Sequence, residues 1–236
     1  MTPDPCPPQQ QVRVVNVELV KPTSTSDGAL SLDGAERDAA GLLPVGYSQQ
    51  LATTSVLGPP VLPLWCVWVE PSPQPIPDRW QRRWLNAVNE ALATWEQALP
   101  IVRVQDRERA HVLVERRRPP RRQLSQGWRA SNGRSLLEVL AVQRLQAWRL
   151  EPRVTVLVSP ELRASALEST ALHELGHAFG LWGHSDEVAD ALSVYQGGEP
   201  VRALTQRDQL TLKWLYQQPT RFGGTPPDQS SGQVAQ

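Results

Sequence analysis

The chain has few cysteines and no apolar run near its start that could span a bilayer. Its two cysteines among 236 residues, Cys6 and Cys66, are too few for the disulfide framework of small secreted domains. The first six residues, Met-Thr-Pro-Asp-Pro-Cys, lack the basic and apolar regions of a secretory signal. From sequence alone we therefore expect no transmembrane segment and a cytoplasmic location.

The chain also lacks an excess of charge of either sign, because 24 basic residues balance 24 acidic ones. A net charge of +0 gives no general attraction to nucleic acid or to anionic membranes, so we expect neither as a partner. Hydrophobic residues make up 40% of the chain, enough for the packed core of one domain with extensions. We expect a monomer without internal repeats.

Histidine is scarce as well, yet three of the four histidines lie between residues 173 and 185. His173 and His177 are four residues apart, which places both imidazoles on one face of a helix and within reach of a single Zn²⁺. Glu174, beside the first histidine, can reach a water on that ion and act as general base. The bare spacing also arises by chance, with two solvated or packed histidines on a helix.

A third ligand has to come from beyond this helix. Gly180 is well placed to end the helix in a left-handed conformation, after which the chain can return and present His184. That set leaves one zinc position open for water and substrate, as catalysis requires. Asp186 or Asp190 could replace His184 as the third ligand, at the cost of more rearrangement.

These residues, His-Glu-Leu-Gly-His-Ala-Phe-Gly-Leu followed by Gly-His-Ser, resemble the HExxHxxGxxH signature of the metzincin clan. Within the clan they are similar to the matrixins, and to bacterial forms with the longer motif HExxHxxGxxxH. The resemblance implies a zinc metalloendopeptidase (a hydrolase) that acts on peptide or protein substrates and is typically secreted. It also implies one catalytic Zn²⁺ held by His173, His177 and His184, with Glu174 as the base.

The chain departs from that pattern at two places. Three residues instead of two separate Gly180 from His184, and Gly183 is expected to let the longer loop bulge. Metzincins place a methionine beneath the zinc, but the only methionine is Met1, and Leu192 occupies the corresponding turn. Leucine and methionine are close in volume, so the exchange should be mild.

Cys6 has three interpretations. It can be an ordinary thiol in an irregular tail, which the composition favours, or form a single bridge with Cys66. By resemblance to matrixin zymogens it could also block the zinc, although the flanking arginine of that motif is absent.

The pattern along the chain predicts an α+β fold with a twisted mixed sheet of about five strands and three helices. The resemblance implies a metzincin-like catalytic domain over residues 59–222, in which a turn and a C-terminal helix follow the zinc helix. A largely irregular extension is expected over residues 1–58 and a disordered tail over residues 223–236. Strands are predicted at 64–69, 101–104, 111–114, 136–142 and 154–158, and helices at 78–99, from 165 and from 205.

Three further features carry weaker hypotheses. Residues 136–142 fit a helix nearly as well as a strand; as a strand, the resemblance makes them the edge that pairs with substrate. Five arginines between residues 116 and 122 could bind an acidic partner, but a solvated loop is the simpler interpretation. Tyr195 could steady an oxyanion or pack in the turn, and His111 is expected to be a packed strand residue.

Two other classes of function remain open. The first is a catalytically weak or inactive zinc-binding interaction module with the same fold, which Leu192 and the longer ligand loop would fit. Glu174 argues against it, because a structural zinc site needs no base. The second is a metallohydrolase acting on a non-peptide amide.

Overall fold

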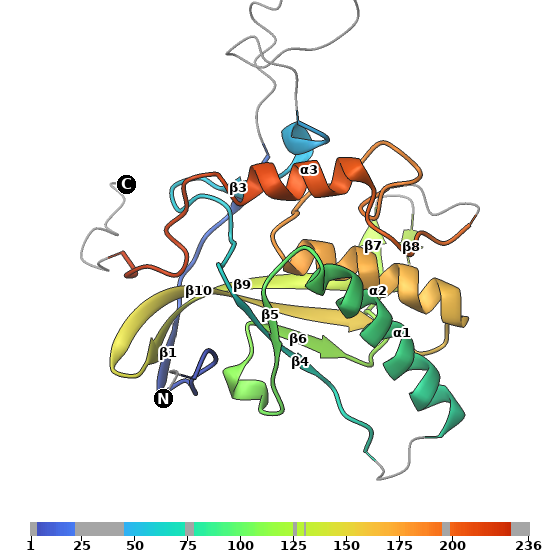
Figure 1. Cartoon of the computed structure of the whole chain (residues 1–236), viewed down its shortest axis with the longest axis horizontal. Coiled ribbons are helices and arrows are strands. Elements are labelled where there is room, and N and C mark those ends of the chain that lie inside the picture. Colours follow the sequence, from blue (N-terminus) through green and yellow to red (C-terminus); the bar gives the residue numbers. More distant parts are fainter. Residues whose placement is uncertain are drawn as a thin grey trace, which may run out of the picture.

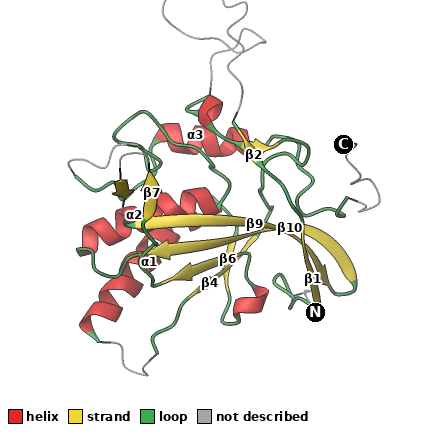
Figure 2. Cartoon of the chain, turned by 180° about the vertical axis from the view of Figure 1, so that it is seen from behind, coloured by secondary structure: helices red, strands yellow, loops and turns green. Residues whose placement is uncertain are grey.

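The computed structural model describes residues 4–21, 45–73, 78–124, 127–129, 131–194 and 199–227. Over these residues the chain is an α+β protein with a mixed six-stranded sheet and three α-helices (Figure 1). Helices α1 and α2 cover one face of the sheet, and α3 lies beyond α2 (Figures 1 and 2). The coarse fold class expected from the sequence is therefore confirmed.

The main sheet has the strand order β1-β9-β10-β6-β4-β5. Strands β10, β6, β4 and β5 run parallel to one another, whereas β9 is antiparallel to both β10 and β1. Every predicted strand forms, and residues 136–142 belong to a strand rather than a helix. The strands are β1 Gln11–Val14, β4 Trp65–Val69, β5 Ile101–Arg103, β6 Val112–Glu115, β9 Gly133–Arg144 and β10 Ala147–Val158.

Two buried tryptophans of α1 (Arg79–Glu96) bond this helix to the sheet and to α2. The indole of Trp84 donates to the carbonyl of Val158 at 3.1 Å, and that of Trp95 donates to Leu172 in α2 at 3.0 Å. Asp78 caps α1 in a capping box with Gln81. The buried apolar residues of α1 form its core face, whereas Trp80 at the helix start is 49% exposed.

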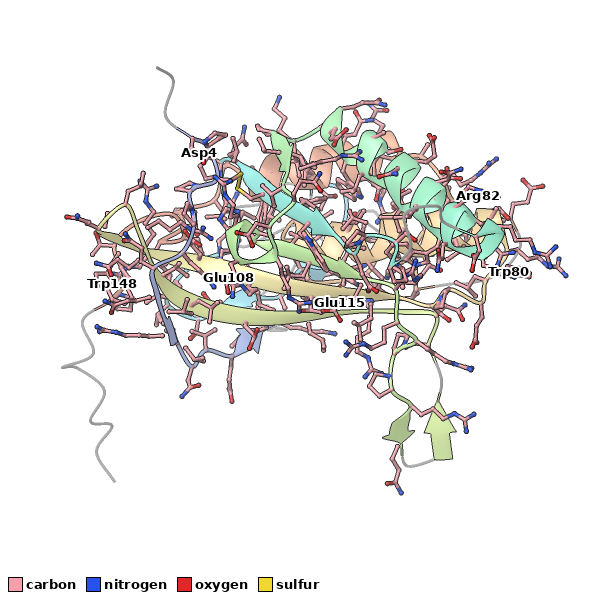
Figure 3. All side chains as sticks on the ribbon, turned by 90° about the horizontal axis from the view of Figure 1, so that it is seen from below. Asp4, Trp80, Arg82, Glu108, Glu115 and Trp148 are labelled. Carbon is pink, nitrogen blue, oxygen red and sulfur yellow. A yellow bond between two sulfur atoms is a disulfide. The ribbon has the colours of Figure 1, made fainter. Side chains whose placement is uncertain are left out.

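The other two helices begin close to where the sequence predicts. Helix α2 spans Ala164–Ala178, and α3 spans Gln206–Leu215, with Thr205 and Asp208 forming its capping box. The smaller elements are β2 Leu19–Val20, η1 Ser48–Gln50, β3 Thr53–Thr54, η2 Arg107–Arg109, β7 Arg122–Leu124 and β8 Gly127–Arg129. The β7–β8 hairpin projects from the body of the molecule (Figure 3).

The described part of the N-terminal extension is built into the fold. Strand β1 adds a sixth strand to the five expected, and its residues 11–14 pair with residues 140–143 of β9. Tyr47, Leu51 and Leu57 are buried members of the hydrophobic core. The boundary expected at residue 58 therefore falls inside a continuously packed unit, because these apolar side chains complete the core around α3. Residues 22–44 lie outside the described residues.

A disulfide joins Cys6 to Cys66 at the start of β4, with the two Cα atoms 6.0 Å apart. It lies beside Asp4, near the end of the molecule that carries Trp148 (Figure 3). The interpretation of Cys6 as a free thiol in a tail is wrong, and its sulfur is not available to block a metal. Both cysteines are almost fully buried, so the bridge fastens the residues before β1 to β4, next to the far edge strand β5.

The C-terminal stretch begins as a packed segment. Gly223 donates to the carbonyl of Leu150 in β10, and Leu150 donates to Gly224, each at 2.8 Å. Residues 228–236, which make up most of the expected disordered tail, lie outside the described residues. None of the helices in the described ranges is long and apolar enough to cross a membrane.

The arginine run after β6 is largely neutralised by ion pairs. Arg117 contacts Glu115 at 3.0 Å and Arg118 contacts Glu161 at 3.1 Å. Arg116 reaches Glu70 at 3.6 Å. These pairs support the interpretation of the run as a solvated connection between strands.

The first prediction concerns the disulfide. It closes a loop of 60 residues, so replacing both cysteines by alanine should lower the free energy of unfolding by about 4 kcal/mol through chain entropy. Urea denaturation of the oxidised protein and of the Cys6→Ala/Cys66→Ala variant measures the difference. Oxidised protein should also expose no titratable thiol when denatured, and two free thiols would contradict the bridge.

Candidate metal centre

Helix α2 presents the first two histidines and the acidic residue of the motif. His177 and Glu174 are buried, and His173 is partly buried. The helix packs closely at Gly176, where an added Cβ would lie 2.6 Å from Leu192 and 3.1 Å from Trp95. The absence of a side chain at this position therefore lets α2 rest directly on Leu192.

A glycine-dependent turn ends this helix. Gly180 has a φ of +107°, and an added Cβ there would lie 2.5 Å from a methyl of Val61. The amide of Leu181 donates to the carbonyl of Gly176 and that of Gly180 to His177, each at 3.0 Å. These two bonds form a Schellman motif, which reverses the chain toward the metal site as the sequence predicts.

The extra residue of the ligand loop is taken up by two tight turns in succession. Trp182 donates to Gly180 at 2.8 Å, and Gly183 donates to Leu181 at 2.9 Å. Each bond spans only two residues, so the backbone contracts locally. An added Cβ on Gly183 would lie 2.2 Å from the carbonyl oxygen of Gln50, which explains the need for glycine beside the N-terminal segment.

The three predicted histidines converge. The ligand nitrogens of His173, His177 and His184 all lie within 4.8 Å of one another, and the ring centroids are 4.9–5.2 Å apart. A tetrahedral zinc with bonds of about 2.1 Å holds its ligands about 3.4 Å apart, so small side-chain rotations would close this set around an ion. His184 is exposed, which leaves the site open on that side.

Backbone carbonyls orient two of the rings. Nδ1 of His173 lies 2.9 Å from the carbonyl oxygen of Ala191, and Nδ1 of His177 lies 2.7 Å from that of Leu181. A carbonyl can only accept, so Nδ1 carries the proton and Nε2 keeps its lone pair for a metal. This donor set fits a zinc ion with an open fourth position.

Burial keeps the histidines neutral. Desolvation and the neighbouring His184 lower the pKa of His173 to about 4. Desolvation and the other two histidines lower the pKa of His177 to about 3. Desolvation, with the charge of Lys21, also lowers the pKa of His184. Neutral imidazoles are the metal-binding form, so the site is prepared for a cation.

A buried carboxylate on α3 holds the turn that orients His173. Asp208 Oδ2 accepts from the amides of Ala191 and Thr205 at 3.0 and 2.9 Å, and its Oδ1 accepts from the hydroxyl of Tyr47 at 2.8 Å. Because Ala191 also accepts from His173, Asp208 acts on the metal centre through this turn. Burial and the charge of Asp208 raise the pKa of Tyr47, so the phenol remains a donor.

Glu174 meets strand β9 on the opposite side of the site. The hydroxyl of Ser135 lies 2.7 Å from Glu174 Oε2 and 2.9 Å from the Glu174 carbonyl oxygen. Gly133 leaves room for the carboxylate, because an added Cβ would lie 2.7 Å from Oε1. Burial raises the pKa of Glu174 to about 7, although Ser135 and the charge of Arg134 oppose the rise.

The other candidates lie apart from the three histidines. Asp190 is buried and accepts from Ser185, Thr205 and Arg207 at 2.5–3.0 Å, and Asp186 pairs with Arg207 at 2.6 Å. Both carboxylates are committed to this network, so His184 and not an aspartate completes the cluster. His111, directly before β6, is buried and accepts from the amide of Cys66, so it is a packed residue as expected. Tyr195 lies outside the described residues.

Sequence reasoning missed the residues that support the motif, above all Ser135 and Tyr47. Asp208 belongs to the capping box of α3, but nothing local in the sequence indicates its bond to Ala191. A single serine or tyrosine far from the motif carries no signal of its own, because only the tertiary fold brings it to the site.

Comparison with known proteins adds no relative to these observations. No protein-family model matches the chain, and no curated protein matches it significantly.

The second prediction tests the third ligand. His184→Ala should lower zinc affinity by more than about 100-fold, beyond the usual cost of losing an outer-shell partner. His111→Asn is the matched control, since His111 lies in the sheet and should leave zinc affinity unchanged. Competition with a chromophoric chelator measures both variants, and equal affinities would contradict the assignment of His184.

The third prediction concerns the metal-free protein. The folded pKa values of His173 and His177 lie below the ordinary 6.5, so the unfolded chain binds more protons. Their contribution to stability is therefore complete above pH 6.5 and is lost as the pH falls through about 4 and then about 3.

Urea denaturation of the chelated protein between pH 7 and pH 4 measures this loss. A His173→Gln/His177→Gln variant should show a shallower dependence on pH, because it lacks both groups. An identical slope in the two proteins would contradict the prediction.

Proposed function

We propose that this chain is a zinc-dependent metalloendopeptidase of the metzincin type, close to the matrixins. The observation that carries the proposal is the convergence of His173, His177 and His184 with a carboxylate, Glu174, on the same helix as two of the ligands. Three neutral nitrogens and an open position are the donor set of a catalytic zinc site. The order of the strands and the position of α3 after the ligand loop support the same assignment.

The chemistry proposed for the residues is general base catalysis. A bound zinc would polarise the substrate carbonyl and acidify a water molecule. Glu174 takes the proton from that water at its carboxylate and passes it on to the leaving amine. Ser135 hydrogen-bonds this carboxylate from β9, and Gly133 keeps space around it.

The substitution of leucine for methionine beneath the site is compatible with activity. Leu192 is fully buried against Gly176, and its carbonyl accepts from Ser185 at 2.8 Å. The turn is therefore held by backbone bonds that do not depend on the side chain at 192. The alternative, a zinc-binding module without activity, has less support because the acidic residue is retained and oriented.

The disulfide bears on where the protein acts. A buried bridge such as Cys6–Cys66 forms and persists in oxidising compartments. We therefore favour the extracellular location implied by the resemblance over the cytoplasmic one expected from the first residues. The expected partner is a peptide or protein substrate.

The fourth prediction tests the proposed base. Glu174→Gln should reduce peptide cleavage by about 100-fold or more, since general base catalysis contributes about 10²–10⁴-fold. Zinc binding should be retained, because Glu174 is not one of the three ligands. Cleavage of a peptide library, followed by mass spectrometry, gives the first readout and bound zinc the second.

The controls distinguish cleavage by this protein from cleavage by a contaminating peptidase. A chelator should abolish cleavage and added zinc should restore it. The half-buried Glu168, on the same helix and paired with Arg202, provides the matched control Glu168→Gln, which should cleave normally. Full activity in Glu174→Gln would refute the proposed mechanism.

A further inference from the structure

Strand β9 reaches from the metal centre to the far end of the sheet. Its first residues lie against Glu174, through Ser135 and Gly133. Its later residues, 140–143, are paired with β1, and Val15 donates to the carbonyl of Val139 at 2.8 Å. The chain's own N-terminal segment therefore occupies the half of this edge that is distant from the metal.

The half of the edge near the metal is the part that a peptide could join. Among the described residues, no strand pairs with the outer edge of β9 over residues 133–138. Backbone groups of a strand face alternate sides, so Leu137 and Ser135 point to the same edge as Val139. From Ser135 to Val139 the open edge measures about 13 Å, which is room for about four extended residues.

The chain crosses from one side of the site to the other directly after Val15. We call residues 15–21 the crossing segment. It leaves β9 and reaches β3, where Leu19 and Val20 pair with Thr54 and Thr53 (Figure 1). Strand β3 follows Ala52, which donates to the carbonyl of Trp182 in the ligand loop at 2.8 Å. Lys21 is close enough to His184 for its charge to lower the pKa of that histidine.

The crossing segment is held firmly at both ends. Val15 and Val17 pack against the hydrophobic core, while Asn16 between them is exposed. Arg13 in β1 stacks on Trp148 of β10 at 4.3 Å, and the Cys6–Cys66 bridge fixes the residues that precede the strand. A substrate that needed the whole edge of β9 would have to displace β1 from its pairing with β9, against these contacts.

The direction of β9 determines which end of a bound peptide the crossing segment would limit. The strand runs away from the metal centre, so a peptide paired antiparallel to it, as β1 is, runs toward the metal. The peptide residues that pair with β9 then precede the bond that is cut. The crossing segment limits how many such residues the edge can accept.

We propose that β1 and the crossing segment restrict the peptidase to bonds within about four residues of the N-terminus of its substrate. The substrate class is therefore peptides or proteins with a free, extended N-terminal end, from which short oligopeptides are released. This inference rests on the proposed peptidase function and adds a restriction to it.

A nested peptide series tests the restriction on the zinc-loaded full chain. The peptides share one cleaved sequence and carry about two, four, eight or twelve residues before the scissile bond, the longer ones exceeding the open edge. We expect kcat/KM to fall at least about tenfold between four and eight residues, as several main-chain hydrogen bonds are lost. Matched extensions after the scissile bond should have no such effect.

Two proline variants test whether the pairing of Val15 with β9 causes the restriction on peptide length. Val15→Pro removes the donor that bonds to Val139 and should restore cleavage of the long peptides. Val14→Pro is the matched control, because its amide faces away from β9 and its side chain is 62% exposed. The control should discriminate against long peptides as the unmodified chain does.

The outcomes separate the two proposals. Equal cleavage of all lengths overturns the restriction and leaves the peptidase function intact. If no peptide is cleaved, fluorescence anisotropy with the zinc-loaded Glu174→Gln variant decides: preferential binding of the shorter peptides supports the restriction. Binding that is independent of length, or no binding at all, overturns it.

Discussion

The reversal of the chain at Gly180 is the constraint on which the candidate metal centre depends. A helix can present two histidines one turn apart, but a third ligand reaches the same point only if the chain folds back. The positive φ of Gly180 and the two Schellman bonds produce that reversal at the end of α2. Val61 packs where a side chain would otherwise project, so the position admits glycine alone.

The longer loop before His184 packs against the N-terminal segment, and the two support the site together. The turns centred on Leu181 and Trp182 shorten the loop that contains the additional residue before His184. Gly183 then lies against Gln50. The same N-terminal stretch carries Tyr47, which bonds to Asp208 and so supports the turn at Ala191. The longer spacing between Gly180 and His184 is thus matched by contacts from the N-terminal extension, which the sequence predicted to be largely irregular.

Different parts of the fold orient the two buried or partly buried histidines and the buried carboxylate of the site. The buried ring of His177 is oriented by a carbonyl of its own loop, and His173 by a carbonyl of the turn beneath it. Glu174 is buried toward β9, where Ser135 supplies the hydrogen bond that its carboxylate needs. Each group that would work on a substrate is therefore held by a neighbour that does not itself contact the metal position.

Local patterns in the sequence determined the elements and the candidate ligand set. The spacing of His173 and His177, the glycine at 180 and the capping residues of α1 and α3 act over one or two turns, so they can be read without the fold. The β9–β10 hairpin was not evident, because its turn places Leu145 and Gln146 at positive φ, without the glycine or asparagine that marks such turns.

Only the tertiary structure decided the pairing of Cys6 with Cys66, the contact of Ser135 with Glu174 and the docking of β1 on β9. These contacts join residues that are far apart in sequence, and each depends on the completed sheet.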